Sequence, residues 1–199
     1  MTALLWTGAA GAWGFVATFL LDGWTRPGYR PVRHAVSALA LGPRGWVQTA
    51  NFVLCGLAVM GGAVAVAGAL GSALLAVAIG VFGAALAASG VWPMDAMRGY
   101  PPGAPDGTPE DVSMRHRLHD WAGAAVFTTL PAAAFVAAFT VPDAVWKGYS
   151  VLTGVALVAG LLAFGQAWEN DSRYAGLVQR ATIIVGWLWL GLLFGYAAA

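Results

Sequence analysis

The chain has 199 residues, of which 59% are hydrophobic and only 10% are charged. Soluble domains carry roughly 25% charged residues, so most of this surface must face something other than water, and lipid is the default explanation. A formal net charge of +1 gives no sign of nucleic-acid binding, and a single cysteine excludes a disulfide within the chain. We expect one transmembrane domain over residues 1–199, with no room for a separate soluble domain.

Six apolar runs are long enough to cross a bilayer, which takes about 20 apolar residues. The first run lacks a preceding basic segment, which favours a spanning helix over a cleaved signal. Because only helices satisfy their backbone within a single segment in lipid, the pattern predicts an all-α integral membrane bundle of six transmembrane helices. The predicted spans are roughly 3–22, 46–69, 72–93, 119–141, 145–168 and 177–198.

Two of the loops contain signals for helices of their own. In the first long loop, Pro31 suits a first helical position and Gly42-Pro43 suits a stop. We therefore expect a short interfacial helix of about three turns between them, too short to span a bilayer. In the loop before the fourth span, Thr108 is the expected N-cap and Pro109 the first helical residue, so that this helix would run unbroken into the span.

The polar residues gather on one side of the predicted bundle. An even number of spans puts both termini and two short turns on one side, and three longer loops on the other. The loop side carries nine arginines and all three histidines, whereas the terminal side carries only Lys147 among the basic residues. The positive-inside rule would make the loop side cytoplasmic, although arginines kept for a ligand would give the same asymmetry.

Six candidate catalytic residues lie at three helix ends on the loop side. His116 and His119 share a helix face, and Asp120 lies one turn beyond His116. Three histidines with a carboxylate could hold zinc and leave a position open for water. Without a metal, a histidine could act as general base to Ser37, with Asp95 or Asp120 orienting the ring. The catalytic candidates are His34, Ser37, Asp95, His116, His119 and Asp120, and the zinc ligands would be His34, His116 and His119.

A second set of residues suits the binding of a substrate. Arginine forms paired hydrogen bonds with phosphate or carboxylate headgroups, and tryptophan is enriched at membrane boundaries. Arginines at a boundary also extend to water without any ligand, and each polar residue taken alone has such a structural explanation. Taken together, these residues indicate a site, because placing several ionisable groups toward a bundle interior costs free energy. The predicted substrate-binding residues are Arg30, Arg33, Arg115 and Trp121.

Three stretches of the sequence point to a family. They read RPGYRPVRHAVSALALGPRGWVQTANFVLCGL, SGVWPMD and HRLHDWAGAAVF. The first closely resembles the first-loop signature of the domain of unknown function 998 family, the other two look like its next two signatures, and the similarity extends over nearly the whole chain. It implies a six-helix integral protein of a prokaryotic plasma membrane, without an agreed activity. The matching positions are Arg33, His34, Ser37, Gly42, Trp46, Asn51, Phe52, Pro93, Asp95, His116 and His119.

A looser analogy is to the ceramidase-like membrane hydrolases, which combine Ser, Asp and His around zinc. They have seven helices and a second histidine pair spaced His-x-x-x-His, whereas this chain has six predicted spans and His-x-x-His. We predict a membrane-embedded enzyme that hydrolyses a lipid or isoprenoid-like substrate. The partner is then a membrane lipid or an amphipathic small molecule, and nothing indicates the oligomeric state.

Three alternatives to the hydrolase remain open. The first is a non-catalytic binding or accessory protein or a carrier, although transport normally needs ionisable groups at mid-membrane, which are nearly absent here. The second is a terpenoid cyclase, in which an acid such as Asp95 protonates the substrate and deep tryptophans stabilise the cation. The third is haem binding, for which the expected cross-bundle histidine pairs are missing.

Overall fold

The computed structural model describes residues 1–199 and consists of six long helices without a β-sheet. All six are long and apolar enough to cross a membrane, which confirms the predicted all-α bundle. Their ends lie within a few residues of the predicted ones, except that the fourth begins earlier than its predicted span. The helices are α1 (Thr2–Thr25), α2 (Gly45–Ala69), α3 (Ala73–Val91), α4 (Met114–Thr140), α5 (Ala144–Glu169) and α6 (Ala175–Ala198).

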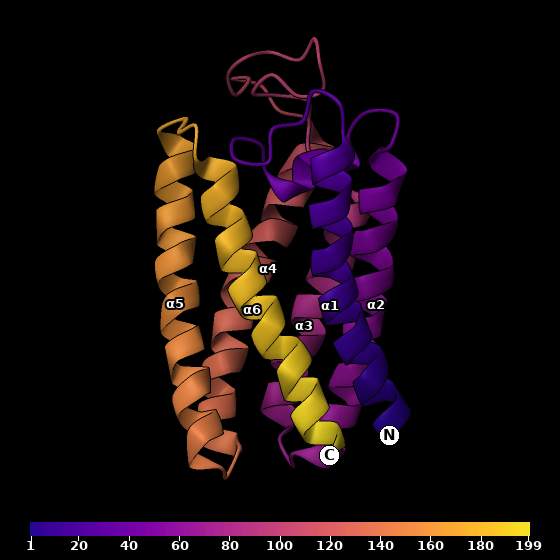
Figure 1. The fold of residues 1–199 in the computed structure, drawn as a ribbon, viewed down its shortest axis with the longest axis vertical. Coiled ribbons are helices and arrows are strands. Elements are labelled where there is room, and N and C mark those ends of the chain that lie inside the picture. The colour runs from indigo at the N-terminus through magenta and orange to yellow at the C-terminus, as the bar shows by residue number, and fades with distance from the viewer.

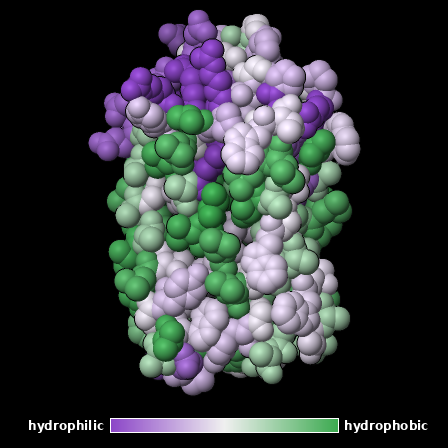
Figure 2. Space-filling view, in the orientation of Figure 1, coloured by the Kyte–Doolittle hydropathy of each residue, from purple (hydrophilic) through white to green (hydrophobic).

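The helices form a closed ring in chain order. Each packs against its neighbours in sequence, and α6 returns to pack against α1. Both termini and the two short turns lie at one end, and the three longer connections lie at the other (Figure 1). Figure 2 shows hydrophilic residues gathered at the loop end, above a predominantly apolar band. The loop end is therefore polar, as the sequence predicts, and the helices below it present an apolar surface (Figure 2).

Small residues allow close packing inside this ring. A Cβ atom at Gly8 would lie 2.8 Å from the Phe194 ring, and one at Gly11 would lie 2.7 Å from the Ala58 side chain. Apolar side chains gain little by leaving lipid, so close backbone approach is a main source of helix association in membranes. Gly8 and Gly11 of α1 thus serve contacts within the bundle.

The N-cap predicted for α4 is wrong. The helix begins at Met114, and the hydroxyl of its cap, Ser113, accepts a hydrogen bond from the backbone N–H of His116 at 3.1 Å. The Asp95 carboxylate accepts the Ser113 backbone N–H and hydroxyl, each at 2.7 Å, and this holds the chain at the start of the helix. Thr108 instead accepts a hydrogen bond from Arg98 at 3.1 Å. His116, His119 and Asp120 still share one helix, as predicted.

The short interfacial helix predicted in the first loop is not confirmed. Residues 31–34 form turns, followed by a five-residue 3₁₀ helix, η1 (Val36–Ala40). Side chains take carbonyls that a longer α-helix would use: Arg180 donates to Pro31 and His34, and the Tyr29 hydroxyl donates to Ala35 at 2.9 Å. The segment packs into the bundle against α1, α2 and α6.

The loop between α3 and α4 is fixed over the loop end of the bundle. The Arg98 guanidinium lies 3.6 Å from the centre of the Trp168 ring and donates to the Trp168 carbonyl at 2.6 Å. Met94, Met97 and Tyr100 from the same loop are buried. This packing brings the loop over the region where α4 begins and α5 ends, and so provides the roof of the cleft described next.

Candidate functional site

A cleft of about 670 Å³ lies between the loop-side halves of α4 and α5. The two helices meet at the turn that joins them and diverge toward the loop end (Figure 1). Residues 108–110 and 112 line it from the loop above, and Phe127 and Phe164, whose rings stack 5.6 Å apart, line it deeper between the helices. Its polar lining residues are Ser37, Thr108, Glu110, His116, His119, Asp120 and Gln179.

His119 has one ring nitrogen held by backbone carbonyls and the other without a hydrogen-bond partner. Its Nδ1 lies 2.8 Å from the Trp92 carbonyl oxygen and 3.2 Å from that of Ser89. Carbonyl oxygens only accept hydrogen bonds, so Nδ1 carries the proton of the neutral ring and Nε2 keeps a free lone pair. Both carbonyls belong to the C-terminal end of α3, where the negative end of the helix dipole stabilises a positive charge on the ring.

His116 has the opposite tautomer when neutral. Its Nδ1 accepts a hydrogen bond from the backbone N–H of Asp95 at 2.9 Å, so the proton lies on Nε2. Nε2 in turn lies 3.4 Å from an Asp120 carboxylate oxygen. The two histidines are one helical turn apart and therefore offer the cleft different chemistry, a hydrogen-bond donor at His116 and a proton acceptor at His119.

We call the place where two spaces of the site share their lining the neck, and it is formed by Ser37, His119 and Gln179. These three side chains line both the cleft and an inner cavity of about 50 Å³. The Gln179 side-chain oxygen accepts the Val36 backbone N–H at 2.7 Å, which fixes the amide and leaves its NH₂ group without a protein partner. The Ser37 hydroxyl and His119 Nε2 also make no hydrogen bond to the protein. Three unpaired polar groups from three elements thus border one narrow space.

The family of the chain follows from a comparison with known proteins. The family described as "Protein of unknown function (DUF998)" matches residues 9–196. The chain belongs to the DUF998 family. No curated protein and no solved structure matches it. The description of the family states no activity.

His34 lies apart from the other two histidines. Its ring packs 5.4 Å from both Tyr29 and Tyr100, and its Nδ1 accepts the Arg30 backbone N–H at 2.9 Å. Burial, and then the charge of Arg33, lower the pKa of His34 to about 4, although a hydrogen bond with the backbone of Arg98 opposes them. No three His, Cys, Asp or Glu side chains lie where they could hold a metal ion together, so the predicted zinc ligands are not assembled in the DUF998 protein.

Asp95 holds the start of α4 and does not line the cleft. Partial burial would raise the pKa of its carboxyl, but hydrogen bonds from Ser113 and the charges of His116 and Arg115 outweigh burial and lower it. Asp95 orients the His116 imidazole, but through its backbone N–H and not through its carboxylate. The Asp95 carboxylate instead binds Ser113 at the start of α4. Asp120 does line the cleft, next to His116.

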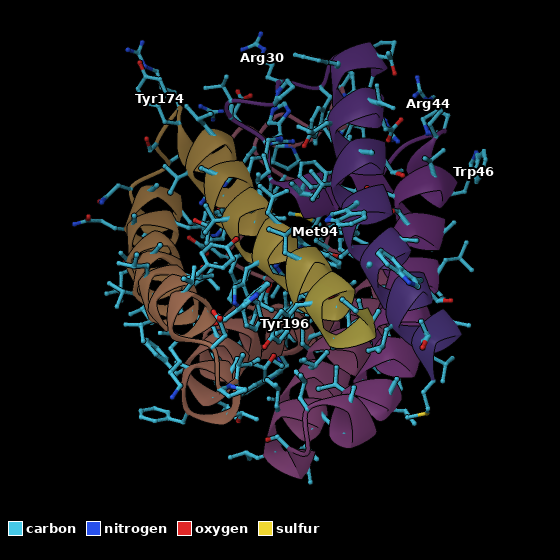
Figure 3. All side chains as sticks on the ribbon, turned by 60° about the horizontal axis from the view of Figure 1, so that its bottom comes forward. Arg30, Arg44, Trp46, Met94, Tyr174 and Tyr196 are labelled. Atoms are coloured by element: carbon cyan, nitrogen blue, oxygen red, sulfur yellow. The ribbon has the colours of Figure 1, made fainter.

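The predicted substrate-binding residues do not line the cleft, and neither does any other arginine or lysine. Arg33 pairs with Asp171 at 3.4 Å, and Arg115 lies 3.8 Å from Asp95. Figure 3 shows Arg30 pointing outward at the rim, whereas Met94, which is buried and lines the cleft, lies near the centre of the view. Trp121 is 77% exposed, as expected of a residue at a membrane boundary.

Sequence reasoning missed one residue of the neck, Gln179. The available signal was a glutamine near the start of an apolar run, where an unpaired amide would be costly in lipid. Its importance comes from α6 bringing it beside η1 and α4, and no local pattern predicts that contact.

Proposed function

We propose that this DUF998 protein is a membrane-embedded hydrolase of amphipathic, lipid-like esters, with Ser37 as nucleophile and His119 as general base. One observation carries the proposal: Ser37 and His119, whose Nε2 makes no hydrogen bond to the protein, both line the cleft and the inner cavity. Hydroxyl nucleophiles need such a base, and the base needs a third group to orient it. Here the Ser89 and Trp92 carbonyls supply that orientation.

The proposed reaction has two balanced steps. The Ser37 oxygen attacks the ester carbonyl carbon, its proton passes to His119 Nε2, and the oxyanion accepts hydrogen bonds from the Gln179 NH₂ group. The ester C–O bond breaks, and the alcohol leaves with the proton from His119. Water then attacks the acyl group on Ser37 in the same way, releasing the acid and restoring both residues. The inner cavity of about 50 Å³ exceeds the roughly 10–15 Å³ that a water molecule needs.

The walls of the cleft suit a substrate that stays in the membrane. Phe127, Leu161 and Phe164 give it an apolar lower part, below the polar groups. A hydrocarbon chain passes from lipid to such a wall with little change in free energy, because both surroundings are apolar. The family resemblance implies the plasma membrane of a prokaryote as the place of this activity, and we propose that location.

Turnover of acyl esters of 4-nitrophenol by the purified protein in detergent micelles tests the proposal. We expect nitrophenolate release from esters of medium-chain acids. The variants His119→Gln and Ser37→Ala should each lower kcat/KM on the order of 1000-fold, because one removes the base and the other the nucleophile.

The matched control is Ser172→Ala, which removes a hydroxyl from the α5–α6 turn outside the cleft and should leave turnover unchanged. A folded His119→Gln variant with wild-type turnover would contradict the proposal.

A second candidate is a protein that binds an amphiphile without reacting with it. It is favoured by one observation, that no hydrogen bond joins Ser37 to His119 in the structure. It predicts binding without turnover in the wild-type protein. The cyclase alternative has less support, because the Asp95 carboxylate is held by Ser113 and does not line the cleft.

A further inference from the structure

We infer that the cleft selects amphiphiles whose polar head is uncharged and bears hydroxyl groups, and that it rejects anionic phosphate heads. The inference rests on the function proposed above and names the substrate class of the same site. It reverses the expectation from the sequence, in which the many arginines of the loop side hold a phosphate. The structure separates those arginines from the cleft.

The charged groups that line the cleft are negative. Glu110 and Asp120 both line it and are both exposed, so they lie where a polar head would meet water. No arginine or lysine lines the cleft to balance them. A phosphate head placed there would face two carboxylates without a cation, and like charges repel each other.

Four arginines of the loop side hold the loops in place. Arg98 stacks on Trp168 and lies 3.4 Å from Asp171, which also pairs with Arg33. Arg26 and Arg44 both pair with Asp22 at the end of α1. These side chains already have carboxylate or aromatic partners, so moving one into the cleft would break an existing contact.

The hydrogen-bonding groups of the outer cleft suit hydroxyls in particular. His116 carries a proton on Nε2, while the carboxylates of Asp120 and Glu110 only accept hydrogen bonds. A hydroxyl both donates and accepts, so a polyol head can satisfy both kinds of group at once. An ammonium head only donates, so it could bind the carboxylates but could not accept a hydrogen bond from the His116 N–H when the ring is neutral. Glycerol-like heads are therefore the best match.

The test uses two ether lipids that no hydrolase of esters can cleave, 1-O-hexadecylglycerol and its 3-phosphate. Native mass spectrometry of the detergent-solubilised protein, with both lipids at equal concentration, gives the ratio of the two complexes. We expect the glycerol ether to exceed the phosphate at least tenfold on the wild-type protein. In the double variant Glu110→Gln/Asp120→Asn the ratio should fall below about threefold, because the repelling charges are gone.

The matched control is Asp106→Asn, which removes a carboxylate from the same loop but outside the cleft and should keep the wild-type ratio. Equal or tighter binding of the phosphate by the wild-type protein, or no binding of either lipid, would overturn the inference. Because ethers are not cleaved, selective binding without ester turnover would reject the hydrolase while the head preference stands.

Discussion

Two histidine regions on the loop side of the protein differ in what their ring nitrogens contact. His34 is enclosed by Tyr29 and Tyr100, takes a backbone N–H on Nδ1, and borders neither the cleft nor the inner cavity. His119 has one nitrogen held by carbonyls and the other free beside two cavities. The same residue type on the same face thus serves packing in one place and is available for chemistry in the other.

The charged residues around the two histidine regions also differ. Beside His34, Arg180 is buried without a carboxylate partner and donates to the carbonyls of Pro31, His34 and Gly176 and to the Tyr29 hydroxyl. The cleft has carboxylates and no arginine. A cation therefore fixes the first loop to α6, whereas the region that we propose to be functional keeps the Ser37 hydroxyl, the His119 Nε2 and the Gln179 NH₂ group unpaired.

Replacing Arg180 by leucine should have the largest effect on stability and would show that the His34 region is structural. The carbonyls of Pro31 and His34 would lose their donors, and unpaired buried acceptors cost about 1–3 kcal/mol each. We expect a loss of about 3 kcal/mol, or on the order of 10 °C in Tm. Thermal unfolding in detergent, followed by tryptophan fluorescence, measures this change.

The neighbouring variant Gln179→Leu is the control for Arg180→Leu, because it lies on the same helix but borders the cleft. It removes one acceptor for the Val36 N–H and should lower Tm by less than half as much. An Arg180→Leu variant as stable as the wild type would show that the first loop is not held by this side chain.

Acidification should destabilise the His34 region by a smaller amount. The pKa of His34 is about 4 in the folded protein and about 6.5 when unfolded, so between these values only the unfolded state binds the proton. The resulting stability is complete above pH 6.5 and is lost as the pH falls toward 4. From pH 7 to pH 5 we expect a loss of about 2 kcal/mol, measured as a fall in Tm.

His34→Asn separates this titration from that of other groups. Its side-chain oxygen can still accept the Arg30 backbone N–H, but the side chain does not titrate in this range. The variant should therefore lose less Tm than the wild type between pH 7 and pH 5. An equal loss in both proteins would assign the pH dependence to other residues.

The fold could be read from the sequence, and four of the six candidate catalytic residues do line the cleft. Hydropathy gives six spans because each helix must satisfy its own backbone in lipid. His116, His119 and Asp120 share a face because their spacing on one helix is a local property. Ser37 reaches the same cleft, which the polar clustering on one face anticipated.

The rest depends on contacts between distant segments. The place of His34 is decided by Arg180, which is 146 residues away in the chain and holds the His34 carbonyl at 2.8 Å. The arginines were expected to bind a headgroup because the sequence shows their charge but not their partners, such as Asp171 for Arg33. Gln179 reaches the neck only through the packing of α6 beside η1, and helix periodicity contains no information about it.

The most direct test of the account is covalent labelling by an alkyl fluorophosphonate, with the modified residue mapped by peptide mass spectrometry. The serine oxygen displaces fluoride at phosphorus only where a base takes its proton, so the label reports the proposed pair itself. The account predicts one labelled residue, Ser37, in the wild-type protein and its loss in His119→Gln but not in His34→Asn. Labelling of another residue, or of Ser37 undiminished in His119→Gln, would contradict it.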